Sequence, residues 1–348
     1  MSGPSDRERG RTPAPPRRAA AMSDVGELAG VSHQTVSRVI NGSEHVRPET
    51  RQRVLEAMRE LGYRPNLTAR ALATGRSNTV GVVSFDTTLY GPASTLLGIE
   101  RAADEAGYFI MIASMKALDR ASVVEAVERL RLHAVEGILV IAPLKDAADA
   151  LLHAPEGNPL AADGGPTAAI PVIEVDQFAG AVRATRHLLE LGHQTVWHVA
   201  GPPEFLESEQ RLEGWRATLE ASGSQSPPPL VGDWGAQSGY ELGRRLSADP
   251  AVTAIFVAND QMALGLLRAM HEAGRAIPGD VSVVGFDDIP EAAFFLPPLT
   301  TIRQDFDRIG SRSLQLLLAT IEAGERLSSG ARVQPELIVR ASAGAPPR

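Results

Sequence analysis

The sequence predicts a small all-α module followed by an α/β core built from two doubly wound parallel sheets. Residues 22–65 show apolar residues at helical spacing, separated by turn signals. From residue 79 onwards, short β-rich apolar runs alternate with helical patterns, which is typical of βαβ units and a parallel sheet. About ten such runs exceed one comfortable sheet, so we expect the core to have two lobes.

Charge is divided unevenly along the 348 residues. The net charge of the whole chain is −8, which taken alone argues against a nucleic-acid partner. Residues 1–78, however, contain 13 Arg and no Lys against 8 Asp and Glu, a charge of +5, whereas residues 79–348 carry −13. A small basic module on a large acidic body often marks a nucleic-acid-binding arm, and ordinary scatter of charge along the chain is the alternative.

Composition divides the chain into five segments. Residues 1–21 contain four Pro and five Arg and little that could be buried, so we expect a disordered tail. The helical module covers 22–65, a connecting segment 66–77, the α/β core 78–340 and a short frayed tail 341–348. The chain has no cysteine, no membrane-spanning apolar run and no signal-peptide pattern, so a cytoplasmic location is expected. A nucleic-acid-binding arm would make that location nucleoid-associated.

Three helices are expected in the module. The first ends at Gly30, because the tight turn there needs a positive φ. The second begins after Ser32, a suitable N-cap, and the third runs from Pro48 to Gly62. The inner faces are expected to carry Val25, Leu28 and Ala29, then Val36, Val39 and Ile40, then Val54, Met58 and Leu61.

The outward arc of the second helix is polar. At about 100° per residue it carries Gln34, Ser37, Arg38 and Asn41, with His33 in the first turn. Such side chains can hydrogen-bond to base edges and phosphates in a DNA major groove. An ordinary three-helix bundle with a solvated polar face is the alternative.

In the core, strands are expected at 80–85, 108–113, 137–142, 170–175, 195–199, 254–257 and 281–286. Helices are expected at 96–106, 122–132, 180–191, 209–221, 239–246 and 262–273. The Pro-rich stretch 226–229 predicts a loop.

Polar and aromatic residues near strand ends or helix starts are candidates for ligand binding, because open α/β sheets bind ligands at that edge. The polar candidates are Arg211, Asn259, Asp287 and Gln304, and the aromatic ones are Trp234 and Phe306. Together they offer planar donors and acceptors for vicinal sugar hydroxyls and flat faces for a sugar's C–H surface. For each residue the alternative is a helix cap, a strand-end turn or ordinary packing. Asp260 is expected to cap its helix.

The motifs of several common enzyme classes are missing. There is no Gly-x-Gly-x-x-Gly after the first strand, no P-loop, no His-Glu-x-x-His and no Gly-x-Ser-x-Gly. Asp287 and Asp288 are adjacent, and on a strand they would point to opposite faces, which does not suit a glycosidase pair. The eight His show no metal-ligand spacing. We expect a binder without catalytic residues, cofactor or metal.

The order of residues in the module resembles the headpiece of the LacI/GalR-type (lactose-repressor) family of transcription regulators. The resemblance rests on Ala29-Gly30-Val31-Ser32, Thr35-Val36-Ser37-Arg38-Val39, Asn41-Gly42 and Gly62-Tyr63-Arg64-Pro65-Asn66. Residues 69–73 are similar to the family's hinge helix, which implies that Leu72 is a wedge between base pairs in the minor groove. The DNA-binding residues implied are Ser32, His33, Gln34, Thr35, Ser37, Arg38, Asn41, His45, Asn66, Ala69, Arg70 and Leu72. The chain departs from the family at Ala21, where a capping residue is usual, and at Gly26, where alanine is usual.

Residues 80–340 resemble the two-lobed, periplasmic-binding-protein-like core of the same family. The core is especially similar to the galactoside-responsive member after which the family is named, notably at 211–215, 257–265, 283–288 and 297–306. The effector-binding residues implied are Leu89, Pro92, Arg211, Trp234, Asn259, Asp287, Gln304 and Phe306. Phe85 replaces a small polar residue and Val175 an aromatic one, and both changes concern the aglycone side of the ligand.

The resemblance implies a transcriptional repressor of sugar-utilisation genes that binds a pseudo-palindromic operator as a homodimer. A small sugar would release it, with a β-galactoside as the first expectation and another hexopyranoside as the second. Use of the sugar as a co-repressor stays open. Only eight residues follow Arg340, so the family's tetramerising helix has no counterpart and a dimer is expected. Other classes are a sugar-binding protein without regulatory DNA binding and a carbohydrate-active enzyme.

Overall fold

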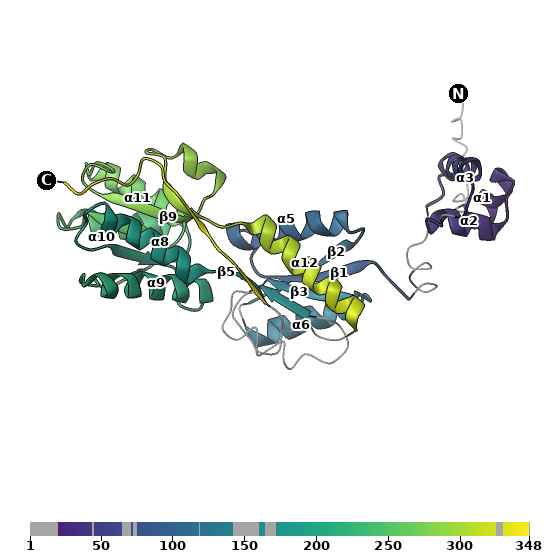
Figure 1. The fold of residues 1–348 in the computed structure, drawn as a ribbon, viewed down its shortest axis with the longest axis horizontal. Coiled ribbons are helices and arrows are strands. Elements are labelled where there is room, and N and C mark those ends of the chain that lie inside the picture. The colour runs from purple at the N-terminus through teal and green to yellow at the C-terminus, as the bar shows by residue number, and fades with distance from the viewer. Residues whose placement is uncertain are drawn as a thin grey trace, which may run out of the picture. The chain divides into compact units, whose positions relative to one another are not determined.

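The computed structural model describes residues 20–43, 45–64, 71, 75–117, 119–141, 160–163, 172–324 and 330–347. The chain divides into two compact units, Met1–Ser77 and Asn78–Arg348 (Figure 1). None of the described helices is long and apolar enough to cross a membrane.

The first unit contains three helices, α1 (Met22–Ala29), α2 (His33–Ile40) and α3 (Pro48–Leu61). Their expected ends are confirmed: φ is 63° at Gly30 after α1 and 60° at Gly62 after α3. The Ser32 hydroxyl accepts a hydrogen bond from the backbone N–H of Thr35 at 3.2 Å, which caps α2. The helices bury a common core of Val25, Ala29, Val36, Val39, Val54 and Ala57.

Two leucines expected in this core are exposed instead. Leu28 is 46% exposed and Leu61 is 37% exposed. Gly26 and Ala57 are buried on those helices. A Cβ atom on Gly26 would lie only 2.9 Å from the carbonyl oxygen of Val31. The helices therefore approach each other so closely that the small residues Gly26 and Ala57 face the core, whereas the apolar pattern favoured the two leucines.

The second unit has two lobes, and the first contains a four-stranded parallel sheet in the order β2-β1-β3-β4. Its strands are β1 (Thr79–Ser84), β2 (Phe109–Ser114), β3 (Gly137–Ile141) and β4 (Leu160–Asp163). Helices α5 (Tyr90–Glu105) and α12 (Phe306–Ala323) cover one face, and α6 (Arg120–Arg131) covers the other. Because Val82 packs toward one layer and Val83 toward the other, β1 is almost continuously apolar.

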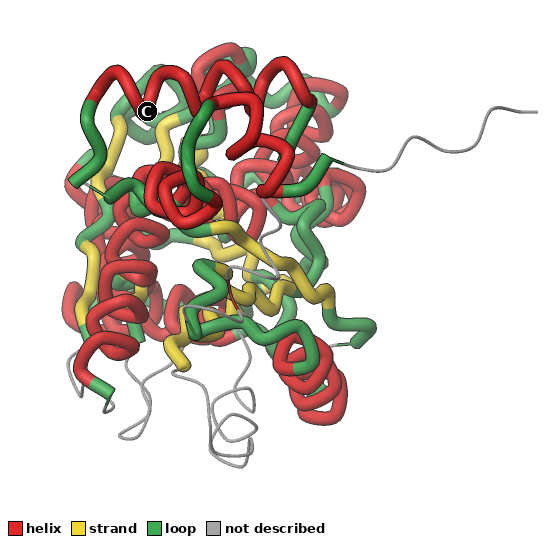
Figure 2. Tube along the Cα trace, turned by 90° about the vertical axis from the view of Figure 1, so that its right-hand side faces the viewer, coloured by secondary structure: helices red, strands yellow, loops and turns green. Residues whose placement is uncertain are grey.

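The second lobe contains a six-stranded sheet in the order β12-β10-β9-β8-β6-β7, in which β12 runs antiparallel to β10. The strands are β6 (Trp197–Ala200), β7 (Leu230–Val231), β8 (Ala254–Val257), β9 (Ser282–Asp287), β10 (Thr300–Arg303) and β12 (Glu336–Ile338). One face packs on α8 (Gln177–Glu190) and α9 (Leu206–Ser222). The other packs on α10 (Ala236–Ser247), α11 (Asp260–Glu272) and the 3₁₀ turn η1 (Pro290–Phe294). Figure 2 shows the strands enclosed by helices.

The chain passes between the lobes three times, from β5 (Ile173–Val175) into α8, from β10 into α12 and from β11 (Ala331–Val333) into β12. β5 and β11 pair in parallel next to each other, so two of the passages lie side by side (Figure 1). The predicted fold class, a small helical headpiece and a core of two doubly wound lobes, is confirmed. The Pro-rich stretch at 226–229 is a loop, as expected.

The C-terminal segment 341–347 is not a frayed tail, so that expectation is wrong for these residues; Arg348 lies outside the described residues. Ser342 is fully buried, and its hydroxyl donates to the carbonyl oxygen of Val283 at 2.6 Å and accepts from the backbone N–H of Thr300 at 2.8 Å. The carbonyl oxygen of Gly344 accepts from the Ser282 hydroxyl at 3.0 Å. The segment satisfies backbone groups of the second lobe that would otherwise be buried without partners.

Candidate functional site

The candidate DNA-contacting surface is the outward face of α2. The Ser32 and Thr35 hydroxyls lie 3.0 Å apart, and the Asn41 amide donates to the Ser37 hydroxyl at 3.4 Å. Thr35 and Ser37 are half-buried, whereas the exposed residues of this face are Ser32, His33, Gln34, Arg38 and Asn41. In the described part of the first unit, no hydrogen bond engages the side chains of His33, Gln34 or Arg38. Their polar ends are therefore available to a partner.

The turn between α2 and α3 is held by Arg51, whose guanidinium donates to the carbonyl oxygen of Ser43 at 2.6 Å. His45 is exposed in the same turn. The remaining DNA-binding candidates fall outside the described residues; they are Asn66, Ala69, Arg70 and Leu72. Residues 1–19 of the expected tail also fall outside the described residues.

A pocket of about 380 Å³ is lined by residues of both lobes of the second unit. The first lobe contributes the starts of α5 and α12, and the second contributes strand ends and the starts of α9, α10 and α11. All eight effector-binding candidates line it: Leu89, Pro92, Arg211, Trp234, Asn259, Asp287, Gln304 and Phe306. Val175 also lines the pocket, whereas Phe85 packs against the core of the first lobe.

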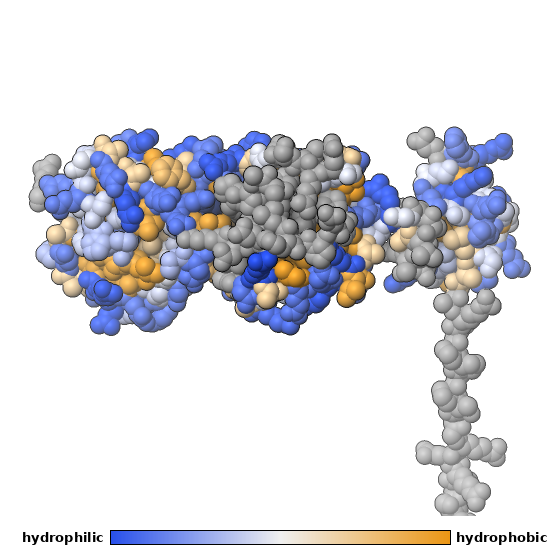
Figure 3. Space-filling view, turned by 90° about the horizontal axis from the view of Figure 1, so that it is seen from below, coloured by the Kyte–Doolittle hydropathy of each residue, from blue (hydrophilic) through white to orange (hydrophobic). Residues whose placement is uncertain are grey.

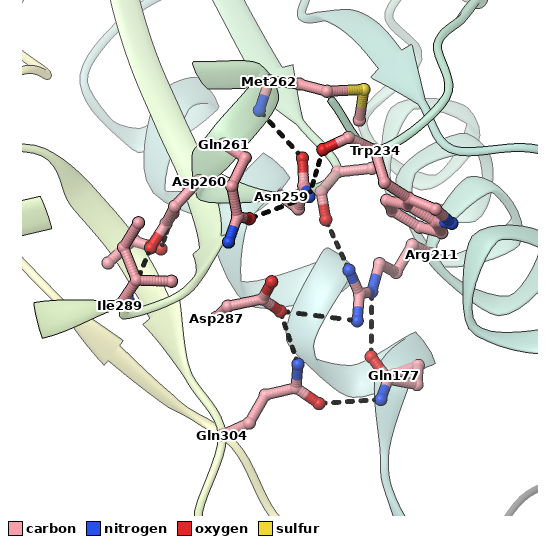
Figure 4. Close-up of polar contacts among 12 residues, drawn as sticks. Gln177, Arg211, Trp234, Asn259, Asp260, Gln261, Met262, Asp287, Ile289 and Gln304 are labelled. Atoms are coloured by element: carbon pink, nitrogen blue, oxygen red, sulfur yellow. Dashed lines mark hydrogen bonds and ion pairs between the residues drawn. The ribbon is translucent and has the colours of Figure 1, made fainter. Parts of the chain in front are cut away.

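Four pocket residues form a closed ring of polar contacts (Figure 4). Arg211 Nε donates to Gln177 Oε1 at 2.9 Å, and Gln177 Nε2 donates to Gln304 Oε1 at 2.8 Å. Gln304 Nε2 donates to Asp287 Oδ1 at 2.6 Å, and Arg211 Nη2 lies 3.7 Å from that same oxygen. Arg211 also donates to the carbonyl oxygen of Ala258. Elements α8, α9 and β9 and the segment after β10 each supply one member, so the ring depends on the correct fold of the lobe.

Burial dominates the electrostatics of this ring. It lowers the pKa of Arg211, against the attraction of Asp287. It also raises the pKa of Asp287 to about 6, although Arg211 and the hydrogen bond from Gln304 act in the opposite direction. The guanidinium carbon lies 3.9 Å from the ring centroid of Phe286 and 5.5 Å from that of Trp234. These fixed donors and acceptors in a poorly solvated pocket suit the binding of a polyhydroxylated ligand.

Aromatic residues form two walls of the pocket. The Trp234 ring meets Phe205 edge-on at 5.7 Å, and the Phe306 ring meets Tyr90 edge-on at 5.6 Å. A Cβ atom at Gly201 would lie 2.2 Å from the indole of Trp234, so only glycine leaves room for that ring.

Asn259, not Asp260, caps α11, so the expectation for Asp260 is wrong. Asn259 Oδ1 accepts from the backbone N–H of Met262 at 3.0 Å, and Asn259 Nδ2 donates to the carbonyl oxygen of Trp234 at 3.0 Å. The second bond holds Trp234 at its unusual φ of 73°. The buried Asp260 carboxylate instead accepts from the Thr301 hydroxyl at 2.6 Å, tying α11 to β10. Burial raises the pKa of Asp260 well above its usual range.

Asp287 and Asp288 face different partners. Whereas Asp287 belongs to the pocket, Asp288 accepts from Arg303 Nε and from Arg340 Nη2, each at 2.6 Å. The two carboxylates thus do not flank one position, as glycosidic cleavage would need. Within the described ranges, no group of three or more His, Cys, Asp or Glu side chains could hold a metal ion.

Three further pocket residues, Tyr90, Gln177 and Glu207, are absent from the sequence-based candidates. Gln177 begins α8 directly after the Asp176 cap that follows β5, so the strand-end rule that selected Asn259 could have found it. Glu207 lies one helical turn before Arg211 in α9, a spacing that could also have indicated it.

Two family models match the chain. Residues 21–66 match the bacterial regulatory proteins of the lacI family, and residues 185–343 match the periplasmic binding protein-like domain.

Several characterised proteins are similar over most of the chain. The lactose operon repressor of Escherichia coli is 35% identical over 328 residues, covering 93% of this chain and 91% of that protein. The transcriptional regulator CelR of Thermobifida fusca is 35% identical over 326 residues, covering 88% and 93%. The transcriptional repressor PurR of Haemophilus influenzae is 34% identical over 333 residues, covering 93% and 98%.

Solved structures give the same picture. A lac repressor dimer bound to operator and the anti-inducer ONPF matches with a TM-score of 0.86 at 34% identity, covering 94% of this chain and 100% of that chain. A complex of the transcriptional regulator CelR with cellobiose matches with a TM-score of 0.70 at 31% identity, covering 93% and 99%.

Proposed function

The chain belongs to the lacI family of bacterial regulatory proteins and is a DNA-binding transcriptional repressor, and from that premise we propose that it controls sugar-utilisation genes and is released from its operator by a small sugar. The pocket carries this proposal. The ring of Arg211, Gln177, Gln304 and Asp287 offers directed donors and acceptors beside aromatic walls, which is the chemistry that recognises vicinal hydroxyls and a C–H face.

A β-galactoside is the first candidate for the effector. It is supported by the similarity to the lactose operon repressor and by the eight candidate positions that line the pocket. A glucoside is the second candidate, because a similar solved structure, at 31% identity, is a complex of a transcriptional regulator CelR with cellobiose.

The operator is proposed to be pseudo-palindromic and bound by a homodimer. The exposed face of α2 would enter the major groove, with Gln34, Arg38 and Asn41 reaching base edges or phosphates and Leu72 as a minor-groove wedge. Two copies on one symmetric site would place their headpieces one helical turn or more apart.

Exposed apolar side chains on the second unit support self-association. In the first lobe they include Leu97 on α5 and Phe109 and Ile112 on the edge strand β2. In the second lobe they include Phe294 and Leu296, which are 84% and 91% exposed. Figure 3 shows apolar patches among hydrophilic residues on one face of this unit. Uncovered patches of this kind are typical of protein–protein interfaces.

Release requires that the sugar bind one arrangement of the lobes better than the other. Closing the pocket would change the relation between the first lobes of a dimer and separate the two connecting segments. Operator affinity and sugar affinity are then coupled reciprocally, so operator DNA must weaken sugar binding by the same factor.

A gel-shift assay of the full chain on its upstream DNA tests the proposal. Galactosides, glucosides including cellobiose, and free hexoses are titrated against the complex. Release by galactosides alone is the expected result. Release by glucosides alone would favour the second candidate, tighter binding would indicate a co-repressor, and no response to any sugar would contradict the proposed function. Arg38→Gln should abolish or weaken the shift, whereas Glu213→Gln, exposed on α9, should not.

A further inference from the structure

Carboxylates outnumber cations around the pocket. Its lining includes four of them, Glu174, Glu207, Asp233 and Asp287, whereas Arg211 is the one Lys or Arg among the lining residues. The charged groups among the described lining residues are therefore mostly acidic.

Three of the four carboxylates already have partners within the protein. These partners are Arg211 and Gln304 for Asp287, Arg332 for Glu174 at 2.5 Å, and the backbone N–H of Gly235 for Asp233 at 2.8 Å. Arg211 in turn is occupied by Gln177, Ala258 and Asp287.

Glu207 differs from the other three. It lies in the first turn of α9, one turn before Arg211 and thus on the same side of the helix. Within the part of the chain that the structure describes, no hydrogen bond or ion pair with another residue engages its carboxylate. Burial raises the pKa of Glu207 to about 7, against the attraction of Arg211. Its acceptor oxygens are thus left for an occupant of the pocket.

We propose that Glu207 is a specificity-determining residue that accepts hydrogen bonds from hydroxyls of an uncharged sugar and rejects sugars carrying a carboxylate or phosphate. A carboxylate accepts several hydroxyl donors without any rearrangement of the ring around Arg211. A second negative charge close to Glu207 in a poorly solvated pocket is repelled, because charges interact more strongly there than in water. The assignment rests on the proposed sugar-binding function. Two measurements distinguish a failure of the assignment from a failure of that function.

The first measurement needs no sugar. Fluorescence quenching at pH 8 compares iodide, an anion, with neutral acrylamide on the full chain. The signal of Trp234 is isolated as the difference between each protein and its Trp234→Phe derivative, because the chain has two other tryptophans. We expect Glu207→Gln to increase iodide quenching of Trp234 several-fold while acrylamide quenching stays unchanged. Glu213→Gln removes the same charge outside the pocket and should change neither. Equal iodide quenching in Glu207→Gln and the parent overturns the assignment.

The second measurement is calorimetric titration at pH 8 with a neutral hexose, its uronic acid and its 6-phosphate, for galactose and glucose. The parent should bind only a neutral sugar, and Glu207→Gln should gain affinity for the matching anionic sugars by about tenfold or more, the size expected for one removed charge contact. Equal affinity of the parent for a neutral sugar and its uronic acid overturns the assignment. Failure of the parent to bind any sugar overturns the proposed function instead, and the iodide result then shows only whether Glu207 repels anions from the pocket.

Discussion

Arg211 holds the pocket together through contacts that few other side chains could make. It donates to Gln177 and Ala258, pairs with Asp287 and stacks over Phe286. A planar guanidinium satisfies all of these at once, whereas an ammonium group cannot. Its loss would also leave Asp287 buried without a counter-charge, which is costly in a protein interior.

Arg211→Lys is expected to lower sugar affinity by about 2–3 kcal/mol, or roughly 30- to 150-fold, because the planar contacts are lost while the charge remains. Operator binding should persist, since α2 is in the other unit. Calorimetry and gel shifts measure the two effects. Arg216→Lys, exposed on the same helix, is the matched control. Unchanged sugar affinity in Arg211→Lys would contradict a central role for the guanidinium.

His198 gives the second lobe a dependence on pH. Its ring is buried between Phe256, at 4.6 Å, and Trp215, at 5.4 Å, and its Nε2 atom has no partner in the described structure. Burial, assisted by the charge of Arg211, lowers the pKa of His198 to about 4. The unfolded chain takes up this proton near pH 6.5 and the folded chain only near pH 4, so acidification through that window destabilises the fold.

His198→Phe should flatten the loss of stability between pH 6.5 and 4. The substitution should remove a loss of about 3 kcal/mol in the free energy of unfolding across this window, the amount that follows from the difference between the folded and unfolded pKa values of His198. Chemical denaturation at several pH values measures it, and the comparison is of slopes, because the substitution also removes the contact between Nδ1 and the carbonyl oxygen of Phe256. His271→Asn, at an exposed position, should keep the parental slope. A parental slope in His198→Phe would refute the assignment.

Among the elements, α1 shows how packing overrides helix propensity. Glycine is a poor helix former, so helix propensity taken by itself predicts that Gly26 makes α1 less stable. The structure instead places it against the turn before α2, where a Cβ atom would lie 2.9 Å from the carbonyl oxygen of Val31. The start of α1 has a compensating contact, since the backbone N–H of Ala21 donates to the Asp24 carboxylate at 2.8 Å.

Gly26→Ala is therefore expected to destabilise the first unit by about 1–3 kcal/mol, the usual cost of overpacking, although alanine favours helices. Hydrogen exchange of α1 amides in the full chain and operator affinity should both report the loss. Glu27→Ala, exposed on the same helix, should leave exchange unchanged or slower. Slower exchange in Gly26→Ala would mean that propensity outweighs the contact.

The sequence predicted most strands and helices because both faces of each sheet are buried, which leaves long apolar runs such as β1 and β9. It did not predict α12, whose 18 residues pack on α5 after the chain returns to the first lobe. Its inward residues Ile309, Leu314 and Leu317 do follow helical spacing. Short strands such as β7 and β11 owe their form to neighbours rather than to their own residues, so local patterns could not reveal them.

The pocket was more predictable than its details. Strand ends meet at one edge of a sheet, so Asn259 and Asp287 could be grouped from their positions in sequence. The link from Gln177 to Gln304 joins residues far apart in the chain, and no local pattern indicates it. The packed segment around Ser342 was missed for the same reason, because its partners lie on β9 and beside β10.

Across the whole molecule, the two units differ in the sign of their net charge. The basic stretch 1–78 carries +5 and the remainder −13. The acidic second unit is expected to repel the DNA duplex, which would confine contact to the first unit and the connecting segment. Operator affinity should therefore depend steeply on salt through a small number of phosphate contacts.

Arg38→Gln is expected to reduce the magnitude of the slope of log affinity against log salt concentration by about one, if Arg38 contacts a phosphate. Operator titrations between low and physiological salt measure this slope. Arg216→Gln in the second unit is the control and should not alter it. An unchanged slope with relaxed sequence preference would assign Arg38 to a base edge instead.

The ring in the pocket has a direction. It starts at Arg211, which can only donate, and ends at the ionised Asp287, which can only accept, and the amides of Gln177 and Gln304 are forced into one orientation between them. Replacing either amide by an acidic, basic or apolar side chain breaks this directed series of hydrogen bonds. A change of effector specificity would thus require the residues of the ring to change together. The aromatic residues of the pocket and Glu207, in contrast, can change one substitution at a time.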